Sequence, residues 1–237
     1  MKVRTILLVL IYVFLVICLT PVVFFFMIFG IRDPLISIGK WAMRLSQLIL
    51  GLRLDVSGLE HAGHAGAHIF MPNHLSFLDG PMMVMLIPQP VRVILKKEVF
   101  RIPIVGSGMR QADFVAVDRK GTKGGQASIE RAARLMRDKG YSFLVFPEGT
   151  RSLDGNLQRF RRGGFFLALE SGAPIVPISI KGTFELMPKG HLFPKKGCIR
   201  VVFHPAISVQ GYSRDNLPEL MDKVRESIQS GLSREGK

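Results

Sequence analysis

The stretch MPNHLSFLDG, residues 71–80, joins an apolar run to a segment with helical character. The run 67–71 is typical of a buried strand, and residues 81–87 predict a helix. Residues five apart on one continuous helix point about 140° away from each other. His74 and Asp79 can therefore meet only if the chain turns between them. The order strand, turn, helix provides that turn.

A histidine–carboxylate pair of this kind can move a proton. A neutral imidazole can take the proton of an alcohol while that alcohol attacks a carbonyl. A carboxylate on the other ring nitrogen fixes the tautomer and stabilises the imidazolium that forms. A second interpretation stays open, because Ser76 and Asp79 also fit a helix capping box, with His74 as an ordinary loop residue.

The composition indicates contact with lipid and with anions. The chain has 237 residues, which predicts one domain or one domain with an appendage. An apolar fraction of 48% is high, and a net charge of +14 favours a phospholipid surface, nucleic acid or phosphorylated substrates as partners. Cys18 and Cys198 are too few for a disulfide framework, and Cys18 lies inside an apolar run.

The N-terminal part of the chain predicts a membrane element. Residues 5–30 are almost continuously apolar, and as a helix they would measure roughly 39 Å, against about 30 Å for a hydrocarbon core. Pro21 leaves open whether the segment spans the membrane or lies in one leaflet. Basic residues on both sides predict that the rest of the chain lies on the cytoplasmic side, at the inner membrane if the protein is bacterial.

Residues 34–54 predict an amphipathic second helix, which either lies among headgroups or packs on the core, and Trp41 would suit the interface. We therefore expect membrane-associated helices over residues 1–54 and a single α/β domain over 55–237. Alternating strands and helices in the second part predict a layered domain with a mostly parallel sheet flanked by helices. The expected strands are 54–57, 67–71, 91–95, 114–117, 142–146, 175–180 and 199–203. The expected helices are 81–87, 126–139, 163–171 and 216–232.

A second group of polar residues follows the predicted strand that ends near Phe146. Glu148, Gly149, Thr150 and Arg151 supply a carboxylate, a flexible backbone position, a hydroxyl and a guanidinium. Arg151 could hold a phosphate through two parallel hydrogen bonds. Equally, a Glu148–Arg151 pair could simply fix the loop.

Basic residues end two further predicted strands, Lys96 with Lys97 and, later, Arg119. The carboxyl ends of parallel strands meet at one edge of a sheet, so we expect these cations to share an edge with His74. Three histidines, His61, His64 and His68, lie in an Ala- and Gly-rich stretch without a cysteine, and we expect no metal site there.

The motif NHLSFLD, followed by EGTRS at 148–152 and APIVPI at 173–178, resembles the glycerophospholipid acyltransferase family, most closely its bacterial type that acylates 1-acyl-glycerol-3-phosphate. The resemblance covers about residues 50 to 210. It implies that His74 is a general base oriented by Asp79, and that Arg151 binds the acceptor phosphate. It implies substrate contacts for Lys96, Lys97, Arg119, Glu148, Gly149, Thr150 and Arg151.

We therefore expect an O-acyltransferase that moves a fatty acyl group from acyl-CoA or acyl carrier protein to the hydroxyl of 1-acyl-glycerol-3-phosphate, giving phosphatidic acid for phospholipid biosynthesis. The acyl donor is a substrate, and we expect no cofactor. An acyltransferase acting on a lyso-ornithine lipid or on glycerol 3-phosphate is an alternative. A membrane-tethered nucleic-acid-binding protein is a further one. We do not expect nucleic acid as a partner, because aromatic residues are not interleaved with the basic ones.

Overall fold

The computed structural model describes residues 3, 6–11, 13, 14, 17, 33–63, 65–102, 105–117, 122–191 and 193–233. Most of the apolar run expected over residues 5–30 lies outside these residues, and those of its residues that are described are helical. Among the described residues, no helix combines the length and the apolar character needed to cross a membrane.

Seven strands form one sheet in the order β1-β7-β6-β2-β5-β3-β4. The five strands from β6 to β4 run parallel, whereas β7 is antiparallel to β6 and β1 runs parallel with β7. The fold is therefore the expected layered α/β domain with a mostly parallel sheet. The strands are β1 (Leu52–Ser57), β2 (Ile69–Pro72), β3 (Val91–Lys96), β4 (Val115–Val117), β5 (Ser142–Leu144), β6 (Ile175–Lys181) and β7 (Gly197–Phe203).

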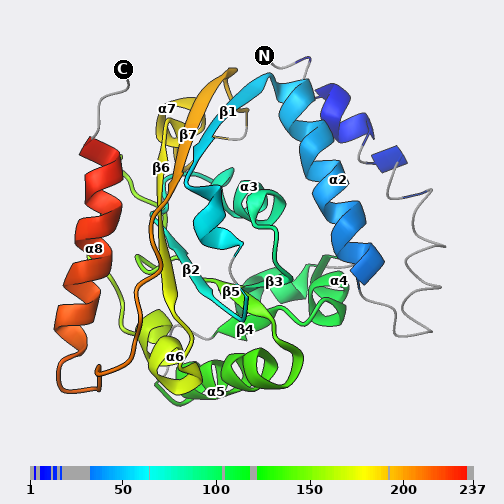
Figure 1. The fold of residues 1–237 in the computed structure, drawn as a ribbon. Coiled ribbons are helices and arrows are strands. Elements are labelled where there is room, and N and C mark those ends of the chain that lie inside the picture. The colour runs from blue at the N-terminus through cyan, green and yellow to red at the C-terminus, as the bar shows by residue number, and fades with distance from the viewer. Residues whose placement is uncertain are drawn as a thin grey trace.

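Helices cover both faces of this sheet (Figure 1). One apolar core lies between the sheet and α5, α6 and α8, and a second lies between the sheet, α2 and α3. Central strands such as β2 are buried on both faces, which explains why they read as continuous apolar runs. The helices are α2 (Asp33–Leu50), α3 (Asp79–Leu86), α4 (Val105–Gln111), α5 (Thr122–Lys139), α6 (Gly163–Ser171), α7 (Thr183–Leu186) and α8 (Leu217–Ser233), with 3₁₀ turns η1 (Leu59–Ala62) and η2 (Lys97–Arg101).

The predicted helix over residues 34–54 is too long by four residues. Helix α2 ends at Leu50, and Gly51 follows with a φ of 69°, a left-handed conformation that glycine adopts without strain. Strand β1 begins at Leu52 because residues 52–57 pair with residues 197–202 of β7. Pairing across the sheet therefore overrides the helical spacing of Leu52 and Leu54.

Candidate active site

The turn after β2 brings His74 and Asp79 together. Asp79 opens α3 and is fully buried, and its Oδ2 lies 2.9 Å from Nδ1 of His74. The expectation that a bend in the chain joins these side chains is confirmed. Because Nδ1 donates to the carboxylate, the neutral ring carries its lone pair on Nε2. The imidazole stacks on Phe146 at a centroid distance of 4.0 Å, and the side chain is 20% exposed, so the ring keeps access to solvent.

The capping interpretation is correct only in part: the Asp79 carboxylate accepts the Ser76 N–H, but the N-cap of α3 is Leu78, which has no side-chain cap hydrogen bond. The same Oδ2 of Asp79 accepts the backbone N–H groups of Leu75 and Ser76, each at 2.7 Å. One oxygen thus closes the turn and orients the imidazole. His74 is therefore not an ordinary loop histidine, and its orientation depends on the same contact that shapes its backbone.

Two neighbouring side chains fasten this turn to the rest of the sheet. The Asn73 amide donates to the Ile180 carbonyl at 2.9 Å and accepts the Ile180 N–H at 2.7 Å, which extends the pairing of β2 with β6 by one side chain. The buried Ser76 hydroxyl donates to the Met187 carbonyl at 2.7 Å, in the connection between α7 and β7. Sequence reasoning had assigned neither role, because both partners lie more than 100 residues away.

Glu148 lies behind the histidine and holds its backbone. Its Oε1 accepts the backbone N–H of His74 at 2.6 Å, and its Oε2 accepts that of Gln158 at 2.8 Å. The Ser152 N–H in turn donates to the His74 carbonyl at 2.8 Å. Burial raises the pKa of Glu148, and the backbone donors Gln158 and His74 act against that rise. The two predicted motifs therefore form one hydrogen-bonded unit.

The loop after Glu148 is fixed by close packing. Gly149 has a φ of 73°, and a Cβ there would lie 2.7 Å from Cδ of Arg161. The Thr150 carbonyl accepts the side-chain amide of Gln158 at 2.9 Å. Side-chain and backbone donors of Asn156, together with the Ser152 hydroxyl, lower the pKa of Asp154 to about 2. No short-range signal in the sequence identified Gln158 or Arg161 as supports of this loop.

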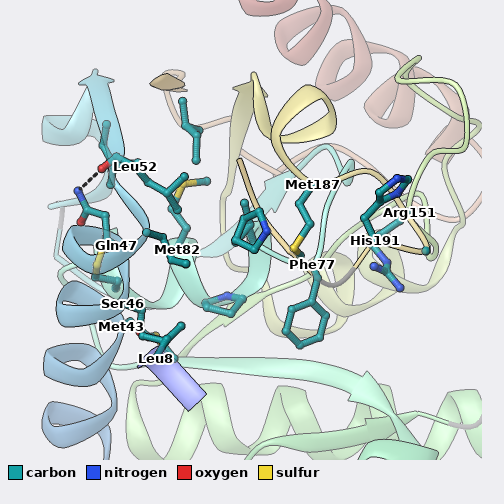
Figure 2. Close-up of a pocket in the computed structure, with 18 residues that line it drawn as sticks. Leu8, Met43, Ser46, Gln47, Leu52, Phe77, Met82, Arg151, Met187 and His191 are labelled. Atoms are coloured by element: carbon teal, nitrogen blue, oxygen red, sulfur yellow. Dashed lines mark hydrogen bonds between the residues drawn. The ribbon is translucent and has the colours of Figure 1, made fainter. Parts of the chain in front are cut away.

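A pocket of about 480 Å³ opens beside residues 73–78, the turn between β2 and α3, which we name the catalytic turn after the expected role of His74 (Figure 2). Its wall is mostly apolar and comes from α2, α3, β1, the catalytic turn and the α7–β7 connection. Figure 2 draws Arg151 and His191 at one end of the pocket, and Leu8 and Met43 at the other. The described lining residues are Leu8, Met43, Ser46, Gln47, Leu50, Leu52, Leu54, Phe77, Leu78, Pro81, Met82, Met85, Arg151, Met187, Gly190, His191, Pro194 and Ile199.

The other predicted cations that the structure describes, Lys96 and Lys97, lie outside the pocket lining. Lys96 is the last residue of β3, and Lys97 is the first residue of η2. They therefore lie at the carboxyl end of a strand that is separated from β2 by β5. Arg119 lies outside the described residues. Of the predicted cations that the structure describes, Arg151 is the one that borders the pocket.

The histidines before β2 are explained by local structure. His68 is buried, and its Nδ1 lies 3.0 Å from the Gly66 carbonyl and 3.1 Å from the Gln89 amide. His64 lies outside the described residues. Over the described part of the chain, His, Cys, Asp and Glu side chains form no group of three or more that could hold a metal ion.

Residues 53–181 match the family model described as Acyltransferase, and the chain belongs to that family. The fold and the site are therefore those of an acyltransferase. The histidine and the carboxylate of the motif NHLSFLD, His74 and Asp79, are in contact.

Individual relatives of this chain carry more specific names than the family model. The chain is 31% identical to a 1-acyl-sn-glycerol-3-phosphate acyltransferase of Limnanthes douglasii, over 75% of this chain and 63% of that protein. It is 35% identical to the chloroplastic 1-acyl-sn-glycerol-3-phosphate acyltransferase BAT2 of Brassica napus, over 74% of this chain and 51% of that one. It thus spans between half and two thirds of these relatives. The crystal structure of the 1-acyl-sn-glycerophosphate (LPA) acyltransferase PlsC from Thermotoga maritima matches with a TM-score of 0.75 and 25% identity, over 100% of this chain and 99% of that one.

Proposed function

We propose that this protein transfers a fatty acyl group from a thioester, acyl-CoA or acyl carrier protein, to the free hydroxyl of 1-acyl-glycerol-3-phosphate, giving phosphatidic acid. The observation that carries the proposal is the 2.9 Å contact between Nδ1 of His74 and Oδ2 of Asp79. That contact leaves the lone pair of Nε2 for a substrate hydroxyl.

His74 and Asp79 carry the proton transfers of the reaction. Nε2 of His74 takes the hydroxyl proton while the oxygen attacks the thioester carbonyl, and Asp79 stabilises the imidazolium. The tetrahedral intermediate then expels the thiolate, which recovers the proton from Nε2. The substrate alcohol is itself the nucleophile, so the chain needs no serine or cysteine for an acyl-enzyme.

The pocket supports an amphiphilic substrate. Its apolar wall suits a hydrocarbon chain, and the Arg151 guanidinium at one end suits a phosphate, which it can hold through two parallel hydrogen bonds. A lysophospholipid carries both of these groups. Lys96, Lys97, Arg119 and Thr150 remain proposed contacts to substrate, and Glu148 and Gly149 are proposed to support the acceptor site through the loop that presents Arg151.

A lipid surface is the proposed location of the reaction. Large apolar side chains of the described N-terminal residues are exposed. Phe77 on the catalytic turn is 66% exposed, and Leu153, two residues after Arg151, is 76% exposed. Apolar residues beside cations favour the boundary between headgroups and acyl chains. The basic residues flanking the N-terminal run support a catalytic domain on the cytoplasmic side.

Thiol release tests the proposal. Purified full-length protein is mixed with palmitoyl-CoA and, separately, with 1-acyl-glycerol-3-phosphate, a lyso-ornithine lipid and glycerol 3-phosphate in detergent micelles. We expect rapid release of free thiol with 1-acyl-glycerol-3-phosphate and formation of phosphatidic acid in equal amount. Thiol release with only one of the other two acceptors would support acyl transfer but would change the proposed acceptor.

A further inference from the structure

The connection between α7 and β7 is described over residues 187–191 and 193–196, and hydrogen bonds at Met187 and Lys195 hold it beside the catalytic turn. The Ser76 hydroxyl donates to the Met187 carbonyl at 2.7 Å, and the Lys195 N–H donates to the Leu186 carbonyl at 2.9 Å. Gly190, with a φ of 94°, turns the chain just before His191. This connection is therefore anchored at its base to the same turn that carries His74.

His191 shares the polar end of the pocket with Arg151. Both side chains line the pocket, and Figure 2 draws them at the same end, away from Leu8. The other polar side chains of the described lining are bonded to backbone, Ser46 to the Ala42 carbonyl at 2.6 Å and Gln47 to the Leu52 carbonyl at 3.2 Å. Within the described part of the chain, the guanidinium of Arg151 and the imidazole of His191 have no hydrogen-bond or ion-pair partner. Both are therefore available to a molecule in the pocket.

The charge around His191 selects for an anion. The connection exposes three lysines and contains no acidic residue between 187 and 196. These cations add to the positive potential at this end of the pocket, where an anionic group gains from each of them. The lysines are Lys189, Lys195 and Lys196.

We propose that His191 is a second ligand of the acceptor's phosphate and sets the preference of the enzyme for phosphate-bearing acceptors. This inference rests on the proposed acyl transfer. Arg151 offers its planar fork to two phosphate oxygens, and a ring N–H of His191 donates to a third. The acceptor then lies with its headgroup between the loop after β5 and the α7–β7 connection, both of which are hydrogen-bonded to the catalytic turn.

A phosphate in this place has two sources, the acceptor headgroup and the phosphates of CoA. Steady-state thiol release by full-length His191→Ala distinguishes them, with the acceptor varied at saturating palmitoyl-CoA and the donor varied at saturating 1-acyl-glycerol-3-phosphate. His61→Ala is the matched control, because His61 lies on η1, after the carboxyl end of β1, whereas His191 lies before the amino end of the neighbouring parallel strand β7. Thermal unfolding of each variant checks that the substitutions of exposed His191 and half-buried His61 leave the fold intact.

We expect the KM of His191→Ala for 1-acyl-glycerol-3-phosphate to rise about tenfold, as for one hydrogen bond to a charged group, with the KM for palmitoyl-CoA within twofold of wild type. We also expect the preference over an uncharged monoacylglycerol to fall by a similar factor, and His191→Asn, which keeps an N–H donor, to recover part of the loss. An acceptor KM within twofold of wild type overturns the inference while the acyl transfer stands. A rise confined to the donor KM also overturns it, in favour of CoA. Absence of thiol release by wild type overturns both proposals.

Discussion

Oε1 of Glu148 accepts the backbone N–H of His74 at 2.6 Å, so the carboxylate of one motif holds the histidine of the other. The contact crosses 74 residues of sequence and joins the loops that follow two neighbouring strands, β2 and β5. Because Ser152 N–H also donates to the His74 carbonyl, both backbone groups of the histidine are occupied by the second loop. The position of the imidazole and the position of Arg151 are therefore set together.

Replacing Asp79 with Asn tests the charge behind the imidazole. An Asn oxygen can keep all three contacts of Oδ2, while its amide nitrogen takes the place of Oδ1, which is buried and has no partner among the described residues. The turn should persist, but the imidazolium loses the carboxylate that stabilises it. We expect kcat for thiol release to fall on the order of 10²–10⁴-fold with a circular dichroism spectrum like that of wild type. Full activity of Asp79→Asn would remove the carboxylate from the mechanism.

Replacing Arg151 with Ala tests the phosphate contact. A charge-assisted hydrogen bond contributes about 1.5–3 kcal/mol, so we expect the KM for 1-acyl-glycerol-3-phosphate to rise roughly 10- to 100-fold with kcat less affected. Arg151→Lys keeps the positive charge but loses the planar, two-pronged guanidinium, so its KM should lie between those of wild type and Arg151→Ala. Arg159→Ala, an exposed change in the same loop, serves as the control. An unaltered KM in Arg151→Ala would instead assign the residue to the structure of the loop.

Replacing Glu148 with Gln tests the buried carboxylate through pH. Because the pKa of Glu148 is raised above its ordinary value of 4.5, the folded protein binds this proton more tightly than the unfolded chain. The free energy of unfolding of the wild type therefore falls as pH rises from 4.5 through the raised pKa, and Glu148→Gln lacks that contribution.

Thermal unfolding of both proteins in the same detergent, at several pH values from 4.5 upward, measures this difference. We expect the Tm of wild type to decline relative to that of Glu148→Gln as pH rises. Glu98→Gln, which changes an exposed carboxylate, should follow wild type at every pH. A difference between wild type and Glu148→Gln that is independent of pH would contradict the raised pKa.

Deleting residues 1–30 tests the membrane element. We expect the shortened protein to move from the membrane fraction toward the soluble fraction, because exposed apolar residues of the N-terminal helical segments are removed. Leu8 also lines the pocket, so activity should fall as well. Fractionation by ultracentrifugation at low and high salt measures the distribution. Retention of the shortened protein on membranes at both salt concentrations would place the anchor elsewhere, with Phe77 and Leu153 as the next residues to change.

Much of this arrangement was predictable from the sequence because local patterns carry it. Buried parallel strands read as short apolar runs, and all seven expected strands are present. The spacing of His74 and Asp79 made a turn the condition for their contact, and the order strand, turn, helix together with the family resemblance predicted that contact. The end of α2 was predicted wrongly, because Leu52 and Leu54 fit both a helix and a strand, and only pairing with β7 decides between them.

What could not be predicted depends on contacts between distant segments. The EGTR motif indicated that Glu148 belongs to the site, but nothing in its neighbourhood indicates that its oxygens bind the backbone of His74 and Gln158. His191 gave no signal, because its place in the pocket depends on Ser76 holding the Met187 carbonyl, 111 residues away. Side chains that act through such contacts become visible only when the chain is folded.

Thiol release by His74→Ala, compared with wild type in micelles that contain 1-acyl-glycerol-3-phosphate and palmitoyl-CoA, tests the central claim most directly. We predict a folded, membrane-bound variant whose rate is lower by about 10²–10⁴-fold at every pH, because the variant lacks the imidazole that takes the hydroxyl proton. A rate equal to that of wild type would show that the imidazole does not accept the proton, and the account of this site would be wrong.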